Sequence, residues 1–269
     1  MNQSGNPAQA RARIEAMKRQ FEQKRAIDEA LGSITSKIGI YSGKGGVGKT
    51  TVAVNIATTL ANDGATVGLL DVDIDCPNVV RAMKIAEQPV MGNDQKMIPP
   101  ERFGVKVMSM AFFQENEDEA IIWRGPMVHN AINQLLQTTN WGELDYLIVD
   151  LPPGTSDSPL TVMQSLSMDG FIIVTTPQEL AKVDAKRSIN MIRKLKVNIL
   201  GIVENFSGSI FGAGAGKEIA EELALDYLGH LDIRSEYLDS NLPASLINND
   251  ILNSYRAISK KALASLQQA

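Results

Sequence analysis

The chain has one cysteine, Cys76, among its 269 residues. A single cysteine excludes an intrachain disulfide framework and any metal site built from several cysteines of one chain. It also predicts a reducing compartment, which we take to be the cytoplasm. We expect Cys76 itself to be a buried structural residue, because free cysteine usually behaves as a small hydrophobe. A ligand that bridges two subunits is the alternative.

Histidines and long apolar runs are also scarce. The two histidines, His129 and His230, lie far apart without ligand spacing, and we take both as structural. No run of about 18 uncharged apolar residues occurs, so no transmembrane segment is predicted. The N-terminus also lacks the apolar core of a secretory signal. The net charge of −5 argues against a general nucleic-acid or membrane coat, and no specific nucleic-acid binding is expected.

Short apolar segments alternate with helical ones from residue 37 to residue 269. With 44% hydrophobic residues the chain can bury a full core. The pattern predicts an α/β fold with a mostly parallel, doubly wound sheet covered by helices on both faces. The expected strands are 38–41, 66–70, 105–110, 146–149, 171–175, 199–203 and 227–231, and the expected helices are 51–60, 127–136, 180–195, 217–224 and 244–266.

Residues 1–36 differ from the rest of the chain. Residues 2–7 are polar and predict disorder, whereas 9–30 predict a helix with more basic than acidic residues. Ile14, Met17 and Phe21 form a thin apolar stripe at helical spacing. We interpret this segment as a basic helical arm, partly disordered, that lies on the edge of a domain of residues 37–269. An arm that binds a partner or an anionic surface is the alternative.

Residues 43–51 read GKGGVGKTT and lie between a predicted strand and a predicted helix, which is the context of a phosphate-binding loop. Its glycines allow the backbone amides to point at an anion, and the helix adds its positive end. Lys49 can reach the β- and γ-phosphates, and the Thr50 hydroxyl can ligate Mg²⁺. The expected ATP-binding residues of the loop are Gly43, Lys44, Gly45, Gly46, Val47, Gly48, Lys49, Thr50 and Thr51.

Three aspartates, Asp71, Asp73 and Asp75, follow the second predicted strand. The carboxyl ends of the strands frame the ligand crevice of a doubly wound sheet. One carboxylate there can hold Mg²⁺ or orient the attacking water. For this role Asp73 comes first and Asp71 second, whereas we expect Asp75 to cap the following helix.

A second acidic position, Asp150, ends the apolar run 146–149. An aspartate after four apolar residues is typical of a Walker B strand, and it would lie near Thr50 and Mg²⁺. Pro153 and Gly154 follow, and Gly154 has the amide and the backbone freedom to sense a γ-phosphate. Residues 150–158 are therefore a candidate switch, together with Asp71.

The second lysine of the loop, Lys44, makes GKGGVGKT resemble the deviant Walker A loop of the group that includes the nitrogenase iron protein, MinD and ParA. The resemblance implies an ATP-dependent homodimer in which Lys44 contacts the nucleotide of the opposite subunit. It also gives the second aspartate of the Asp-x-Asp pattern, Asp73, the Mg²⁺ or water role. The implied catalytic residues are Lys44, Lys49 and Asp73, and a plain surface lysine is the alternative for Lys44.

Four further motifs resemble the Mrp/ApbC family, whose members are deviant P-loop ATPases described as iron–sulfur cluster carriers. The motifs are LDYLIVDLPPGTSD (144–157), IIWRGPMV (121–128), TTPQELAKVDAKRS (175–188) and GIVENFSG (201–208). By analogy, Asn205 would bind the adenine edge, and a turn cap is its alternative role. Pro177 and Gln178 would face the same crevice. Trp123 and Arg124 match a motif whose role cannot be derived.

The chain departs from that family at one point. Members usually carry a Cys-x-x-Cys segment shortly after the adenine-site asparagine, but residues 205–214 read NFSGSIFGAG. A cluster shared by two subunits would need four thiolates, and two copies of Cys76 supply two. We therefore expect a dimeric Mg-ATP switch that slowly hydrolyses ATP to ADP and phosphate. Its role in iron–sulfur cluster assembly would be accessory or atypical, with a hetero-partner among cluster-assembly proteins.

The alternative function is a positioning ATPase like MinD or ParA, which acts by ATP-dependent binding of a partner or surface. Such proteins use a membrane helix or a DNA-binding surface. The amphipathic helix predicted at 244–266 has only two lysines, Lys260 and Lys261. Packing against the core therefore explains this helix better.

Overall fold

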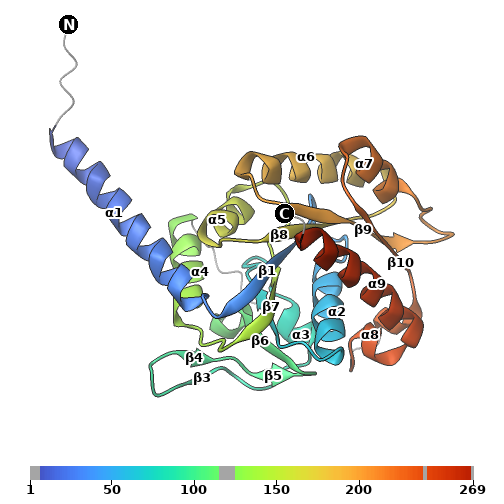
Figure 1. Cartoon of the computed structure of the whole chain (residues 1–269), viewed down its shortest axis with the longest axis horizontal. Helices are drawn as coiled ribbons and strands as arrows, with labels where there is room; N and C mark the ends of the chain where they lie inside the picture. Colours follow the sequence, from blue (N-terminus) through green and yellow to red (C-terminus); the bar gives the residue numbers. More distant parts are fainter. Residues whose placement is uncertain (1–6, 115–124, 239–240, 268–269) are drawn as a thin grey trace, which may run out of the picture.

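The predicted α/β architecture is confirmed by the computed structural model, which describes residues 7–114, 125–238 and 241–267 (Figure 1). The helices are α1 (Pro7–Ala30), α2 (Lys49–Asn62), α3 (Val79–Ala82), η1 (Met110–Phe113), α4 (Gly125–Thr138), α5 (Asp157–Ser165), α6 (Glu179–Leu195), α7 (Ala215–Leu223), η2 (Ser235–Leu238), α8 (Ala244–Ile247) and α9 (Asn249–Leu266). The strands are β1 (Ile34–Tyr41), β2 (Val67–Asp71), β3 (Val90–Met91), β4 (Met97–Ile98), β5 (Glu101–Arg102), β6 (Val105–Ser109), β7 (Leu144–Asp150), β8 (Gly170–Thr175), β9 (Ile199–Ser207) and β10 (Tyr227–Asp232).

The main sheet has the strand order β10-β9-β8-β1-β7-β2-β6-β5. All its pairs are parallel except β5 with β6, and β3 pairs with β4 in a separate antiparallel ladder. Since β1 lies beside β7, and β7 beside β2, their carboxyl ends meet at one edge of the sheet. That edge collects the polar residues that follow each strand.

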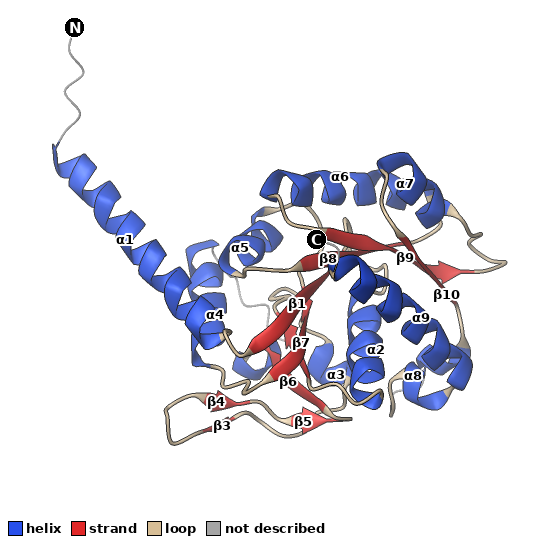
Figure 2. Ribbon diagram, viewed as in Figure 1, coloured by secondary structure: helices blue, strands red, loops and turns tan. Residues whose placement is uncertain are grey.

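Helices cover both faces of the sheet (Figure 2), and an apolar core lies on each face. One contains residues of α1, α4, α5, α6 and α7, and the other contains residues of α2, α3, α8 and α9. Neighbouring residues of a strand alternate between them: Val149 belongs to the first core and Ile148 to the second. Burial on both faces explains why the central strands read as continuous apolar runs.

Several predicted boundaries were wrong. The first strand begins at Ile34 rather than at residue 38, and α5 was not expected at all. The single helix expected at 244–266 is two helices that meet at Asn248. Asn248 has extended backbone angles, and its side chain accepts hydrogen bonds from the amides of Asp250 and Ile251, so it caps a new helix.

The apolar face of α9 packs in the core, as the sequence predicts. Ile251, Tyr255, Ile258 and Ala262 are buried, and α9 lies against α2, β9 and β10. Among the described residues, no helix is long and apolar enough to cross a membrane.

Helix α1 projects from the body of the molecule, with only its last turns docked (Figure 1). Ile27 and Leu31, at and just after its C-terminal end, are buried, and the helix contacts α4. Ile14, Met17 and Phe21 are exposed. Of residues 2–7, for which disorder is predicted, Pro7 begins α1, and residues 2–6 lie outside the described residues, as do Trp123 and Arg124.

Docking of α1 should depend on Ile27 and not on the exposed stripe. We expect Ile27→Ala to lower the free energy of unfolding by about 2–4 kcal/mol, because it removes buried methyl groups and leaves a cavity. The matched control Phe21→Ala, on the exposed side of the same helix, should change it by less than about 0.5 kcal/mol. Urea unfolding followed by circular dichroism measures both, and equal effects would contradict the docking.

Candidate functional site

The loop between β1 and α2 has the shape of an anion cradle. Gly46 and Gly48 have left-handed backbone angles, with φ of 77° and 80°. A Cβ atom at Gly48 would also collide with the side-chain amide of Asn205. Gly48 immediately precedes α2, whose first turn presents free amides and the positive end of the helix dipole. Glycine is therefore required here by conformation and by space.

The Asp150 carboxylate joins this loop to the end of β7. Lys49 Nζ lies 2.5 Å from Asp150 Oδ1, and Thr50 Oγ1 donates to Asp150 Oδ2 at 2.5 Å. Asp150 is completely buried and Lys49 almost so. The structure thus places Asp150 next to Thr50, where the sequence expects it.

Asp73 and Asp71 complete the acidic cluster, at different depths. Asp73 Oδ2 lies 3.7 Å from Lys49 Nζ. Asp71 is fully buried and accepts hydrogen bonds from the Val79 and Asp73 amides and the Ser109 hydroxyl, at 3.0–3.1 Å. The expected cap by Asp75 is wrong: Asp75 is exposed, and it is Asp71 that caps the Val79 amide at the start of α3.

The carboxylates of this cluster carry more negative charge than Lys49 neutralises. Burial, reinforced by the charge of Asp150, raises the pKa of Asp71 to about 8. Burial also raises the pKa of Asp73 to about 6, although the Lys49 ammonium opposes the shift. Hydroxyl and carboxylate oxygens are the hard ligands that Mg²⁺ prefers, so Thr50, Asp73 and Asp150 fit a Mg²⁺ site completed by phosphate and water oxygens.

The candidate switch is tied to the phosphate loop by its backbone. The Gly154 amide donates to the Ser42 carbonyl at 2.9 Å, and the Tyr41 hydroxyl donates to the Gly154 carbonyl. Gly154 has a φ of 85°, and Pro153 lies beside Gly45. Because α5 begins three residues later, a shift of Gly154 would be passed on to this helix.

Lys44 and Asn205 lie on the two sides of the loop. Lys44 Nζ donates to Gln178 Oε1 at 3.3 Å, just before α6, so Gln178 faces the crevice as expected. Asn205 is buried, and its Nδ2 donates to the Val47 carbonyl at 2.8 Å. Asn205 belongs to β9, so the alternative role as a turn cap is wrong. Its contact with adenine and the action of Lys44 in trans stay predictions.

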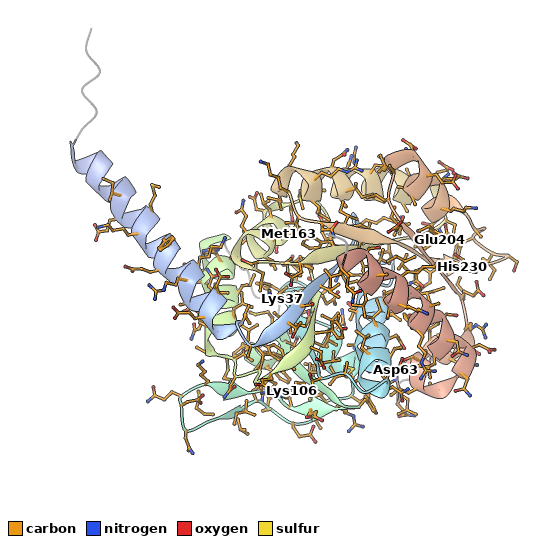
Figure 3. The ribbon with its side chains drawn as sticks, viewed as in Figure 1. Lys37, Asp63, Lys106, Met163, Glu204 and His230 are labelled. Atoms are coloured by element: carbon orange, nitrogen blue, oxygen red, sulfur yellow. The ribbon has the colours of Figure 1, made fainter. Side chains whose placement is uncertain are left out.

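Glu204, on β9 (Figure 3), is a site residue that the sequence patterns do not predict. It is fully buried and accepts hydrogen bonds from the Ser207 hydroxyl and the amides of Gly214 and Gly216, at 2.6–2.9 Å. Gly208 and Gly212 exchange two backbone hydrogen bonds, which close the turn. An acidic residue inside the apolar strand 199–205 was the available signal. Glu204 thus shapes the segment where the resembled family carries its cysteines.

Cys76 and the histidines do not form a metal site. Cys76 is exposed, so its expected burial is wrong, and its amide donates to Asp73 Oδ1 at 3.3 Å. His129 Nε2 bonds with the Asn133 amide at 2.8 Å, and His230 lies 3.7 Å from Asp232. Within the part of the chain that the structure describes, no three His, Cys, Asp or Glu side chains gather as a metal-binding group.

A comparison with known protein families identifies the family of this chain. Residues 33–262 match the family model ParA, described as NUBPL iron-transfer P-loop NTPase. The chain therefore belongs to this family of P-loop NTPases. The resemblance to iron–sulfur cluster carriers is thereby confirmed.

Individual relatives with similar sequences support the same family assignment. The chain is 40% identical over 261 residues to an iron–sulfur cluster carrier protein of Methanocaldococcus jannaschii, covering 91% of this chain and 90% of the relative. It is 42% identical over 256 residues to the iron–sulfur cluster transfer protein NUBPL of Dictyostelium discoideum, covering 88% and 79%.

Solved structures give the same fold. A nucleotide-binding protein of Archaeoglobus fulgidus, in complex with ADP and with cobalt, superposes with a TM-score of 0.71 at 32% identity, covering 87% of this chain and 92% of that one. The cell division ATPase MinD of Pyrococcus furiosus superposes with a TM-score of 0.66 at 20% identity, covering 84% and 98%, which shows a shared fold.

The buried carboxylates predict a dependence of stability on pH. Because folding raises the pKa of Asp71 from 3.8 to about 8, the folded protein retains a proton that the unfolded chain releases. The resulting stabilisation is complete below about pH 4 and is lost as the pH rises towards 8. Between about pH 6 and 9, the free energy of unfolding without nucleotide and Mg²⁺ should fall by about 1 kcal/mol or more.

Asp71→Asn should flatten this dependence, whatever its effect on absolute stability. Glu143→Gln, at an exposed position, should leave the slope as in the unmodified protein. Urea unfolding at a series of pH values measures the slopes. Equal slopes in the unmodified protein and Asp71→Asn would contradict the assignment.

Proposed function

We propose that the protein is a Mg²⁺-dependent ATPase that hydrolyses ATP to ADP and phosphate as part of a conformational cycle in iron–sulfur cluster assembly. The observation that carries this proposal is the Asp150 carboxylate, which holds both Lys49 and Thr50 at 2.5 Å. This contact joins the phosphate loop to the end of β7, which leads directly into the candidate switch of residues 150–158. The ADP complex of the A. fulgidus relative supports a nucleotide ligand.

Each residue then has a chemical role. The amides of residues 43–48 and the start of α2 bind the phosphates, and Lys49 neutralises the β- and γ-phosphates. Thr50, Asp73 and Asp150 would hold Mg²⁺, which when bound neutralises phosphate charge. Asp73, which lies near Lys49 and is less buried than Asp71, would orient the attacking water. Asn205, beside the loop at Val47, would bind the adenine edge.

Gly154 would report the γ-phosphate to the rest of the domain. Its amide is bonded to Ser42, one residue before the loop. If a γ-phosphate takes this amide as a donor, the Ser42 bond must break and residues 150–156 must move. Because α5 follows, the motion reaches the surface of the molecule, where a partner can sense it.

We propose that the active form is a homodimer in which Lys44 reaches the nucleotide of the opposite subunit. Lys44 is held at the rim of the site by Gln178. Exposed apolar side chains flank this rim on α6 and on the turn after β9, and they would be covered in a dimer: Leu180, Val183, Ile210 and Phe211. A Lys182–Glu218 ion pair of 2.5 Å holds α6 against α7, next to that turn.

We propose that this chain has an accessory or atypical role in iron–sulfur cluster assembly. The relatives are named iron–sulfur cluster carrier and transfer proteins. This chain has one cysteine, so a homodimer supplies two of the four thiolates that a shared cluster takes. We infer that a hetero-partner with its own cysteines holds the cluster, in a reducing compartment such as the cytoplasm.

The burial of α9 favours this role over that of a positioning ATPase. A membrane-binding helix must expose its apolar face, whereas Ile251, Tyr255 and Ile258 are packed in the core. We also propose that residues 37–269 form the ATPase domain and that residues 1–36 form a separate basic arm.

Lys49→Ala should abolish the activity by removing the charge that faces the phosphates. We expect ATP hydrolysis to fall by about 100-fold or more, with weaker ATP binding.

Lys44→Ala should bind ATP but lose ATP-dependent dimerisation and hydrolysis. Lys260→Ala on α9 is the control for both variants. Phosphate release, binding of a fluorescent ATP analogue and sedimentation velocity measure these properties. Normal binding and hydrolysis by Lys49→Ala would overturn the proposal.

Metal analysis can test whether this chain alone supplies enough ligands to hold an iron–sulfur cluster. After anaerobic purification and reconstitution, the protein alone should retain far less than the roughly four irons per dimer of a shared [4Fe–4S] cluster. Cys76→Ser should behave in the same way. Iron and sulfide assays with visible spectroscopy provide the readout. A stable cluster in Cys76→Ser would contradict the ligand analysis while leaving the ATPase proposal intact.

A further inference from the structure

Its own domain covers the apolar side chains at the C-terminal end of helix α1 and leaves others exposed. Ile27 and Leu31 are buried, whereas Ile14, Met17 and Phe21 are 56%, 68% and 72% exposed. At about 100° per residue, Ile27 lies roughly 140°, 120° and 80° around the helix axis from Ile14, Phe21 and Met17. The three exposed residues, which we call the seam, therefore lie on a neighbouring side of the helix and nearer its projecting end than the contact that docks α1.

The spacing of the seam matches two heptads of a coiled coil, and the pattern ends at Lys24 and Asp28, which hold the next d and a positions. Ile14, Met17 and Phe21 are separated by three and then four residues, and Ala10 continues the pattern towards the N-terminus. This is the a and d pattern of a heptad repeat, with Ile14 and Phe21 at a and Met17 at d. The seam is about 60° wide, much narrower than the apolar face with which a helix lies in a membrane surface.

The charges beside the seam disfavour a second copy of this chain as the occupant. In this register the sequence has Arg11, Lys18 and Arg25 at the e positions and Arg13 at a g position, with no acidic residue at e or g between 11 and 25. Parallel pairing sets e against g, and antiparallel pairing sets e against e and g against g. Both arrangements bring cations together. Arg25 is paired in part by Glu29, at 2.8 Å.

We propose that the seam of α1 docks an amphipathic helix of a partner protein whose own flanking positions are acidic. The apolar seam supplies the contact area, and the basic flanks select the partner by charge. The site lies beyond the amino end of β1, a strand about 25 Å long with the phosphate loop at its other end. Docking therefore leaves the nucleotide site open, and the partner can stay bound through the ATPase cycle.

The test uses the full chain and two synthetic helical peptides of three heptads. Both have Leu at a and d; the acidic peptide has Glu at e and g, and the basic peptide has Lys there. Fluorescence anisotropy should show saturable binding of the acidic peptide only. Phe21→Gln and Lys18→Glu should each weaken this binding at least tenfold. The exposed controls Val90→Gln and Lys260→Glu should not change it, and ATP hydrolysis should be normal in all four variants.

Other outcomes would overturn the proposal. Equal affinity for the two peptides, or binding unaffected by Phe21→Gln, would show that the seam does not select an acidic helix. Self-association in sedimentation velocity that Phe21→Gln abolishes would assign the seam to a second copy. Co-sedimentation with phosphatidylserine vesicles, abolished by Phe21→Gln and without peptide binding, would assign it to a lipid surface.

Discussion

The Asp150 carboxylate, shared by Lys49 and Thr50, is the contact on which the geometry of the site depends. It is buried at the end of β7, in register with Asp71 on β2 and beside the strand that leads into the phosphate loop. A buried carboxylate is costly without partners, and here one oxygen is bonded to an ammonium and the other to a hydroxyl. The loop and the sheet edge are therefore held together by charge as well as by packing.

The surplus negative charge around Lys49 has a functional meaning. Asp71 and Asp73 have raised pKa values because burial and neighbouring carboxylates disfavour their ionised forms. A divalent cation would relieve this repulsion, so in the proposed cycle the same groups would favour metal and nucleotide together. Binding energy would in this way be coupled to the position of residues 71–79 and 150–154, the segments that we propose respond to a nucleotide.

The sequence predicted most of the fold and the main residues of the site. Continuous apolar strands and the local glycine pattern determine the sheet and the loop, so 43–51 and Asp150 could be placed without coordinates. What failed depends on the course of the backbone within short connecting segments. Asp71 rather than Asp75 caps α3 because Asp71 lies beneath the turn, and Cys76 is exposed because residues 75–76 lie on its outer side. Asn248 divides the last helix because its side chain caps the second half.

Glu204 determines which lengths and sequences the turn after β9 can accept. Its carboxylate binds amides on the far side of the turn, and the strand before the turn holds Asn205 against Val47. The two ends of the turn are thus fixed independently of the residues between them. Since loop length costs little free energy when the ends are already held, segments of different length and chemistry can be accommodated between Gly208 and Gly212. An insert that binds cargo could therefore be gained or lost in this turn without moving Asn205 away from the phosphate loop.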